Sequence, residues 1–103
     1  MTLRFTWRDT KAATNRRKHH VTFETAARVF ADPFALSEQD RIEDGEYRWQ
    51  TIGAVEGVLI LLVAHMVHDE EHGTEVIHII SARVATRAER RRYEQEKYRA
   101  SRG

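Results

Sequence analysis

Apolar and polar residues alternate at the start of the chain and then give way to helical spacing. Residues 3–7 alternate with a period of two, which predicts a short strand. Residues 11–19 contain no glycine or proline and predict a first helix, with Asp9 or Thr10 available as its N-cap. Apolar residues at helical spacing predict a second helix over residues 23–31. Asp32-Pro33 should end it, because a residue before proline avoids the helical region.

The middle of the chain has the period of strands, and the end has that of a helix. Residues 47–53 alternate, residues 58–66 are apolar on both faces, and residues 76–82 are rich in β-branched side chains. These runs predict three strands, the second of them central, and residues 34–39 add a possible edge strand. Thr86 and Glu89 have the spacing of a capping box, which predicts a last helix reaching about residue 99.

This order predicts an α+β fold in one domain spanning residues 1–103. Short turns between the later strands favour a small antiparallel sheet, with two N-terminal helices and one C-terminal helix packed on it. A chain of 103 residues with 41% hydrophobic and 32% charged residues suits one globular domain. It has no cysteine, which excludes disulfides and thiolate metal sites. The N-terminus lacks the apolar run of a signal peptide, so we expect a cytoplasmic protein away from membranes.

Charge is unevenly distributed along the chain. The net charge is only +1, but residues 1–23 hold six Lys or Arg and one acid, and residues 76–103 hold eight Lys or Arg and three acids. Residues 24–75 hold three Lys or Arg and twelve acids. If the fold brings the two ends together, they form a basic face that attracts phosphate backbones. An ordinary solvated surface is the alternative interpretation.

One string has the appearance of a metal site. His68-Asp69-Glu70-Glu71-His72 formally fits a reversed zinc motif, which requires a helix that puts both imidazoles on one face. The string lies between two predicted strands and ends at Gly73, so a polar turn is the favoured interpretation. We therefore expect neither a metal site nor a cofactor.

Basic and titratable residues supply the parts that RNA cleavage without metal needs. Such cleavage takes a base for the 2′-OH, cations for the phosphorane and an acid for the leaving 5′-oxygen. On the first predicted helix, Lys11, Asn15, Lys18 and His19 share a stripe. Elsewhere the candidates are Arg48, Arg83, Arg87, Arg90 and Tyr93. Each also has a structural interpretation: a solvated helix face, a cross-strand pair for Arg48, a salt bridge for Arg83, and a packing anchor for Tyr93.

In their order and spacing, these pieces resemble the BrnT family of toxins. The resemblance rests on Phe5-Thr6-Trp7, Lys11, Asn15, Lys18-His19, Val21, Phe23-Glu24, Ala26, Val29-Phe30 and Asp32-Pro33, then Gly45-Glu46, Arg48 and Ile52-Gly53, then Ile79-Ile80-Ser81-Ala82-Arg83, Ala85-Thr86, Glu89-Arg90 and Tyr93-Glu94. Two positions depart from the family pattern. Arg8 stands where the family usually has Asp, which could alter the helix cap or the charge of the active site. His20 stands where the family often has Gly, and a left-handed backbone there costs more with His.

The resemblance implies a RelE-like ribonuclease fold and RNA cleavage that halts translation. It also implies a partner, a BrnA-type antitoxin, with two toxins around an antitoxin dimer and with operator DNA bound only through the antitoxin. On this reading we expect Lys11, His19, Arg48, Arg83 and Tyr93 to be catalytic, with His19 as the base or acid, and Lys18, Arg87 and Arg90 to bind RNA. The alternative is a non-catalytic RNA- or protein-binding module with the same basic face.

Overall fold

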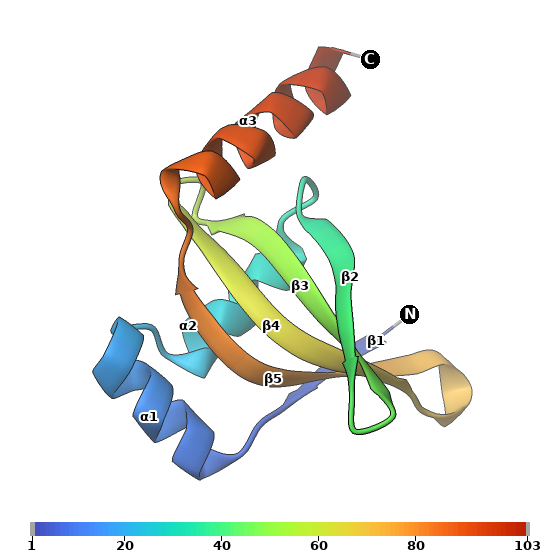
Figure 1. Ribbon diagram of the computed structural model, residues 1–103. Coiled ribbons are helices and arrows are strands. Elements are labelled where there is room, and N and C mark those ends of the chain that lie inside the picture. The colour runs from blue at the N-terminus through green and yellow to red at the C-terminus, as the bar shows by residue number, and fades with distance from the viewer. Residues whose placement is uncertain (1, 103) are drawn as a thin grey trace.

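One mixed sheet forms the centre of the molecule, with two helices behind it and a third at one end (Figure 1). The computed structural model describes residues 2–102. The strands are β1 (Thr2–Thr6), β2 (Leu36–Glu43), β3 (Glu46–Val55), β4 (Leu59–Asp69) and β5 (Thr74–Val84). The helices are α1 (Asp9–His19), α2 (Phe23–Ala27) and α3 (Arg87–Arg102), with 3-10 segments η1 (Arg28–Ala31) and η2 (Glu71–Gly73). No helix within residues 2–102 is long and apolar enough to cross a membrane.

The strand order is β1-β5-β4-β3-β2, which confirms the apolar run in β4 as the central strand. β2 to β5 form the predicted antiparallel meander. The prediction of a wholly antiparallel sheet is wrong at one edge, because β1 pairs with β5 in parallel, from Thr2 opposite Thr74 to Thr6 opposite His78. A parallel pair needs a long crossover connection. Here that connection contains, in the sequence between β1 and β5, both N-terminal helices and the other three strands.

The second predicted helix is shorter than expected. The α-helix stops at Ala27, and residues 28–31 continue as a tighter 3-10 turn that ends before Asp32-Pro33. Such a turn is common at the end of a helix. Gly53 of β3 lies against this turn, since a Cβ built on it would be 2.8 Å from Val29 Cγ1. The sheet and the 3-10 turn can therefore approach this closely only with glycine at position 53.

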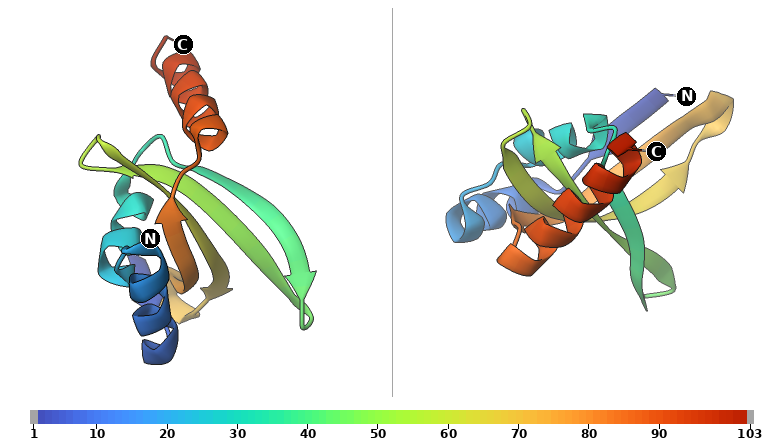
Figure 2. Two further views of the ribbon diagram at one scale, coloured as in Figure 1. Left: turned by 60° about the vertical axis from the view of Figure 1, so that its left-hand side comes forward. Right: turned by 90° about the horizontal axis from the view of Figure 1, so that it is seen from above.

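Apolar side chains fill both faces of the sheet, but over different areas. Behind it, α1, α2 and η1 cover a core that includes Phe23, Val29, Leu61, Val63 and Ile79. On the other face, Ile52, Ala54 and Ile60 pack with Tyr93 of α3. Figure 2 shows α3 at the end of the sheet and the β2–β3 hairpin curving away from α1. The front face is therefore closed beside α3 and open at its other end.

Tyr93 is the anchor of α3. It is the buried residue of that helix at 2% exposure, and its hydroxyl donates to Asp32 Oδ2 at 2.5 Å. Asp32 also accepts from the backbone nitrogens of Phe34 and Ala54. The predicted capping box is confirmed, because Thr86 N donates to Glu89 Oε1 and Glu89 N donates to Thr86 Oγ1.

Both ends of α1 carry the departures noted in the sequence. Its N-cap is Arg8, which makes no side-chain capping bond, so the predicted caps Asp9 and Thr10 are wrong by one or two positions: Asp9 is the first helical residue. Its C-cap is His20, with φ 59° and ψ 28°, in the left-handed region. Glycine adopts that conformation without the crowding that a Cβ brings.

Replacing His20 with glycine should therefore stabilise the protein, by about 0.5–1 kcal/mol. Denaturant unfolding measures the change. His19→Gly is the matched control, because His19 is helical and glycine there should cost about 1 kcal/mol. Equal destabilisation by both substitutions would contradict this account of the helix end.

A chain of polar side chains runs from the buried back of the sheet to the exposed Ser37 of β2. His65 is 2% exposed, its Nε2 lies 2.7 Å from Thr51 Oγ1, and Thr51 Oγ1 shares a 2.7 Å hydrogen bond with Ser37. The ring edge also meets Phe30 at a centroid distance of 4.9 Å. Burial lowers the pKa of His65 from 6.5 to about 4, so the folded protein keeps this imidazole neutral.

Stability should consequently fall as the pH drops from 6.5 towards 4. In that window the unfolded chain binds a proton at His65 that the folded chain does not, so acid favours unfolding. Between pH 7.5 and 5 we expect the free energy of unfolding of the wild type to fall by about 2 kcal/mol more than that of His65→Gln, because glutamine at position 65 does not titrate. Denaturant unfolding at the two pH values measures both losses. Equal losses would show that His65 is not held neutral.

Candidate functional site

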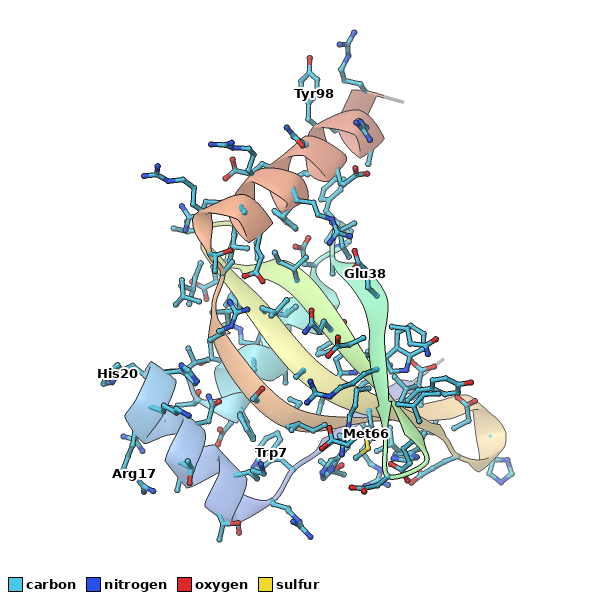
Figure 3. All side chains as sticks on the ribbon, in the orientation of Figure 1. Trp7, Arg17, His20, Glu38, Met66 and Tyr98 are labelled. Carbon is cyan, nitrogen blue, oxygen red and sulfur yellow. The ribbon has the colours of Figure 1, made fainter. Side chains whose placement is uncertain are left out.

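The open end of the front face forms a trough of about 500 Å³. Its lining comes from the start of α1 and from all four strands of the meander: Arg8, Lys11, Asp40, Arg41, Glu43, Asp44, Arg48, Trp49, Ala64, Met66, His78, Ile79, Ile80 and Ser81. Figure 3 labels Met66 in this region and shows it at the opposite end of the sheet from Tyr98 of α3. The trough and α3 are therefore separate features of the surface.

Both irregularities in the sheet register lie at this trough. Between β2 and β3 the pairing shifts between Gln39 and Ile42, around Asp40 and Arg41. Between β4 and β5 it shifts between Ala64 and His65, which leaves Ile80 as the extra residue. Bulges of this kind redirect side chains and are common beside active sites.

His78 is the imidazole of the trough. Its strand neighbours bring it beside Met66 of β4 and Thr6 of β1, and its Nδ1 lies 2.9 Å from Thr6 Oγ1. Burial lowers the pKa of His78 below 6.5, and the charges of His68, Arg8 and Arg48 lower it further, whereas Glu46 opposes them. At neutral pH this imidazole is thus uncharged, with Nδ1 held by Thr6 and Nε2 left to accept or donate.

Arg48 lies in the floor of the trough and is largely buried, with a side chain 20% exposed. Its Nε is buried without a hydrogen-bond partner and lies 3.7 Å from Glu43 Oε2. A buried N–H without a hydrogen-bond partner is costly unless another group completes it. The contact with Glu43 on the neighbouring strand β2 matches the cross-strand pair that was the structural alternative for Arg48, and the guanidinium also lines the trough.

Lys11 and Arg8 supply the cationic wall on the α1 side. Both are exposed and line the trough, and Arg8 stands at the N-cap, where an anion is also favoured by the helix dipole. Arg8 thus adds a positive charge at the trough. The β2 side carries the opposite sign, with Asp40, Glu43 and Asp44.

The remaining predicted site residues lie elsewhere. Lys18 and His19 belong to the last turn of α1, and neither lines the trough described above. Figure 3 shows their neighbours Arg17 and His20 directed away from the sheet. Arg87 and Arg90 are exposed on α3. Of the eight predicted residues, the trough thus brings together Lys11 and Arg48.

Arg83 and Tyr93 have structural partners. Arg83 Nη1 and Nη2 donate to the two carboxylate oxygens of Glu89 at 2.8 and 3.0 Å, and this pairing lowers the pKa of Glu89 to about 2. Burial and the Asp32 bond raise the pKa of Tyr93, so its hydroxyl stays protonated and donates to Asp32. The alternatives stated for both residues, a salt bridge and a packing anchor, match these contacts.

The histidine string does not form a helix. His68 and Asp69 end β4, and η2 is a short 3-10 turn in which His72 has a left-handed backbone. The helix that the reversed zinc motif requires is therefore absent from residues 68–72 as described. The described residues also include no group of three or more His, Asp or Glu side chains placed to hold a metal ion.

Sequence reasoning did not single out His78. It lies between Ile77 and Ile79, where a histidine reads as part of a buried strand. No local signal marks it, because the residues around it are apolar at both periods, and only the strand pairing with Thr6 and Met66 places it in the trough.

Comparison with known proteins agrees with this fold. The family model described as "Ribonuclease toxin, BrnT, of type II toxin-antitoxin system" matches residues 7–89. The crystal structure of the Brucella abortus ribonuclease toxin BrnT is similar, with a TM-score of 0.63 and 21% sequence identity over 84% of this chain and 100% of that one. A comparison with curated proteins gave no match. Because the family model spans most of its length, the chain belongs to the BrnT family of ribonuclease toxins of type II toxin–antitoxin systems.

Proposed function

We propose that the trough is an endoribonuclease site that cleaves RNA by attack of a 2′-OH, without a metal ion, and so inhibits translation. The observation that carries this proposal is that Lys11, Arg48 and His78, from three elements distant in sequence, line one cavity. It contains a neutral imidazole among cations, the combination that this chemistry requires.

His78 is the proposed general base. When Nδ1–H donates to Thr6 Oγ1, Nε2 carries the lone pair that takes the 2′-OH proton. The oxygen then bonds to phosphorus, and the bond from phosphorus to the 5′-oxygen breaks. The lowered pKa keeps His78 available as a base at neutral pH. RNA cleavage should therefore fall only when the pH drops below 6.5, the ordinary pKa of a histidine.

Arg48 and Lys11 have the complementary roles. The guanidinium of Arg48, which lacks a hydrogen-bond partner at Nε, stabilises the negative charge of the phosphorane. Lys11 provides a further cation and is the proposed proton donor to the leaving 5′-oxygen, and Arg8 orients the neighbouring phosphate. In this proposal His78 takes the part first considered for His19, while Arg83 and Tyr93 hold α3 in position. Lys18, Arg87 and Arg90 remain candidates for outer phosphate contacts.

Turnover tests the proposal. The purified protein, in excess chelator, should cut single-stranded RNA at a molar ratio well below one. The alternative is a non-catalytic RNA- or protein-binding module, which the basic α1 side of the trough also allows. Intact RNA that is bound at stoichiometric protein would support that alternative.

A second surface is the proposed site for the antitoxin. Arg87, Arg90 and Arg91 are exposed on α3, and the exposed apolar residues Val58, Leu59 and Val84 lie at the start of that helix, where Ala85 N donates to Ile60 O. A surface that is both apolar and basic suits an acidic, partly apolar protein segment. We assign it to a BrnA-type antitoxin, with two toxins around an antitoxin dimer that alone contacts operator DNA.

Hydrogen exchange on the toxin–antitoxin complex tests this surface. We expect the amides of residues 83–92 to exchange more slowly in the complex than in the free toxin, because the antitoxin segment covers them. The first turn of α1, at the trough, is the internal comparison. Unchanged exchange over residues 83–92 would show that the antitoxin inhibits from another surface, even if it binds tightly.

A further inference from the structure

The two hairpins of the sheet part from each other beside the trough. β3 begins at Glu46 and β4 runs to Asp69, but their pairing ends where Trp49 lies opposite His65. Beyond this pair the β2–β3 and β4–β5 hairpins diverge, as both views of Figure 2 show. The space between them is a notch of about 400 Å³, lined chiefly by Tyr47, Trp49, Met66, Val67 and His68.

Aromatic rings without partners line this notch. By the alternation of a strand, Tyr47 and Trp49 lie on the same face of β3. Tyr47 is 54% exposed, and its cross-strand neighbour Ile42 is 60% exposed. Among the residues that the structure describes, neither ring meets another aromatic ring or a cation, and neither the Tyr47 hydroxyl nor the Trp49 indole N–H makes a hydrogen bond. Exposed apolar and aromatic groups gathered in this way mark a binding surface.

The notch opens into the trough. Trp49 and Met66 line both cavities. Arg48 lies between the two aromatic residues in the sequence, so it points to the other face of β3, where it lines the trough. An RNA whose phosphate lies at Arg48 therefore has a neighbouring base within reach of the notch.

The lining of the notch suits a nucleobase better than a phosphate. The rings of tryptophan and tyrosine stack on the π-face that every base presents, and the thioether of Met66 is polarizable and favours contact with aromatic rings. A phosphate has no such face, and the cations Arg8, Lys11 and Arg48 that would bind it lie in the trough. Stacking does not involve the hydrogen-bonding edge of a base, so it tolerates all four bases.

We propose that the notch holds the base beside the cleaved phosphate by stacking it on Trp49 and Tyr47, with little regard to which base it is. The proposal rests on the trough being the RNA site. It deepens that function by giving a physical reason for a single-stranded substrate, because a base within a duplex is already stacked on its neighbours and is not free to enter the notch.

Binding of RNA that cannot be cleaved tests the notch independently of catalysis. The probes are short single-stranded 2′-fluoro oligouridines, either intact or with one abasic position that is moved along the chain, so that all carry the same phosphates. We expect the wild type to bind the intact probe about 10-fold more tightly than the probe that lacks the stacked base. Adenosine at that position should bind within about 3-fold of uridine, since stacking is tolerant of sequence.

Tyr47→Leu should remove most of the difference between intact and abasic probes, because leucine is apolar but has no ring to stack on, whereas Tyr47→Phe should retain it. Tyr98→Leu is the matched control. Tyr98 is a tyrosine that is 61% exposed on α3, at the opposite end of the sheet from Met66 (Figure 3). Thermal unfolding checks that the three variants are folded.

The fluorescence of Trp49 reports stacking directly. The chain has two tryptophans, so Trp7→Phe leaves Trp49 as the single one. Trp7 packs edge-on against Phe23, and phenylalanine at position 7 keeps an aromatic ring there. We expect the intact probe to quench the emission of Trp49 and the probe without the stacked base to leave it nearly unchanged.

Three results would overturn the notch as a base site: equal binding of intact and abasic probes by the wild type, a difference that is unchanged in Tyr47→Leu, or no binding of any probe. Quenching of Trp49 by the antitoxin but not by RNA would assign the notch to the protein partner instead. Failure of the proposed ribonuclease activity is seen separately, as intact RNA in the cleavage assay. Base-dependent binding without cleavage would retain the notch and reject the catalysis.

Discussion

His78→Gln should lower RNA cleavage by about 10²–10⁴-fold, the usual contribution of a general base. Glutamine can keep a hydrogen bond to Thr6 but cannot take a proton at neutral pH. The loss should therefore appear in kcat, with little change in KM. Single-turnover cleavage of a labelled RNA measures it, and unfolding curves check that the variant is folded.

His19→Gln is the comparison that locates the base. His19 was the histidine that sequence reasoning favoured, but it lies on the last turn of α1, outside the lining of the trough. Cleavage that persists in His19→Gln and is lost in His78→Gln agrees with the trough as the site. The reverse result would move the base to α1.

Replacing Arg48 with glutamine should cost about 10²–10³ in kcat, because a cation positioned at the phosphorane is lost. The same change should displace the acidic limb of the pH–rate profile. Since the charge of Arg48 lowers the pKa of His78, its removal raises that pKa. Activity in the variant should thus begin to fall at a higher pH than in the wild type. A pH–rate profile of both proteins measures the displacement.

Arg83→Gln is the matched arginine for this experiment. Arg83 pairs with Glu89 at the start of α3, so its loss should lower stability and leave kcat largely unchanged. A full loss of cleavage in a folded Arg83→Gln protein, with Arg48→Gln still active, would contradict the roles assigned to the two arginines.

Local sequence signals predicted much of this fold. The capping box of Thr86 and Glu89 forms as expected, because both partners lie within one turn. The run of apolar residues on both faces of β4 marks the centre of the sheet, since only a strand covered on both sides needs it. His20 adopts the left-handed conformation expected from its place at the end of a helix.

The arrangement of the trough depends on pairings that local patterns do not contain. β1 joins β5 in parallel, and this long-range pairing sets Thr6 beside His78. The register shifts at Asp40–Arg41 and at Ile80 leave no periodic signal in the sequence. Lys11 and Arg48 were chosen as candidates by residue type and family resemblance, but His78 became a candidate only once the strands were assembled.

The chemical ends of the cleaved RNA test the central claim most directly. Attack by the 2′-OH, with His78 as base and Arg48 at the phosphorane, leaves a 2′,3′-cyclic phosphate on one fragment and a 5′-hydroxyl on the other. Mass spectrometry of products made in excess chelator identifies these ends. Cyclic phosphate and 5′-hydroxyl ends that disappear in His78→Gln are the result we predict. Fragments with 3′-hydroxyl and 5′-phosphate ends, or RNA left intact by the folded wild-type protein, would contradict it.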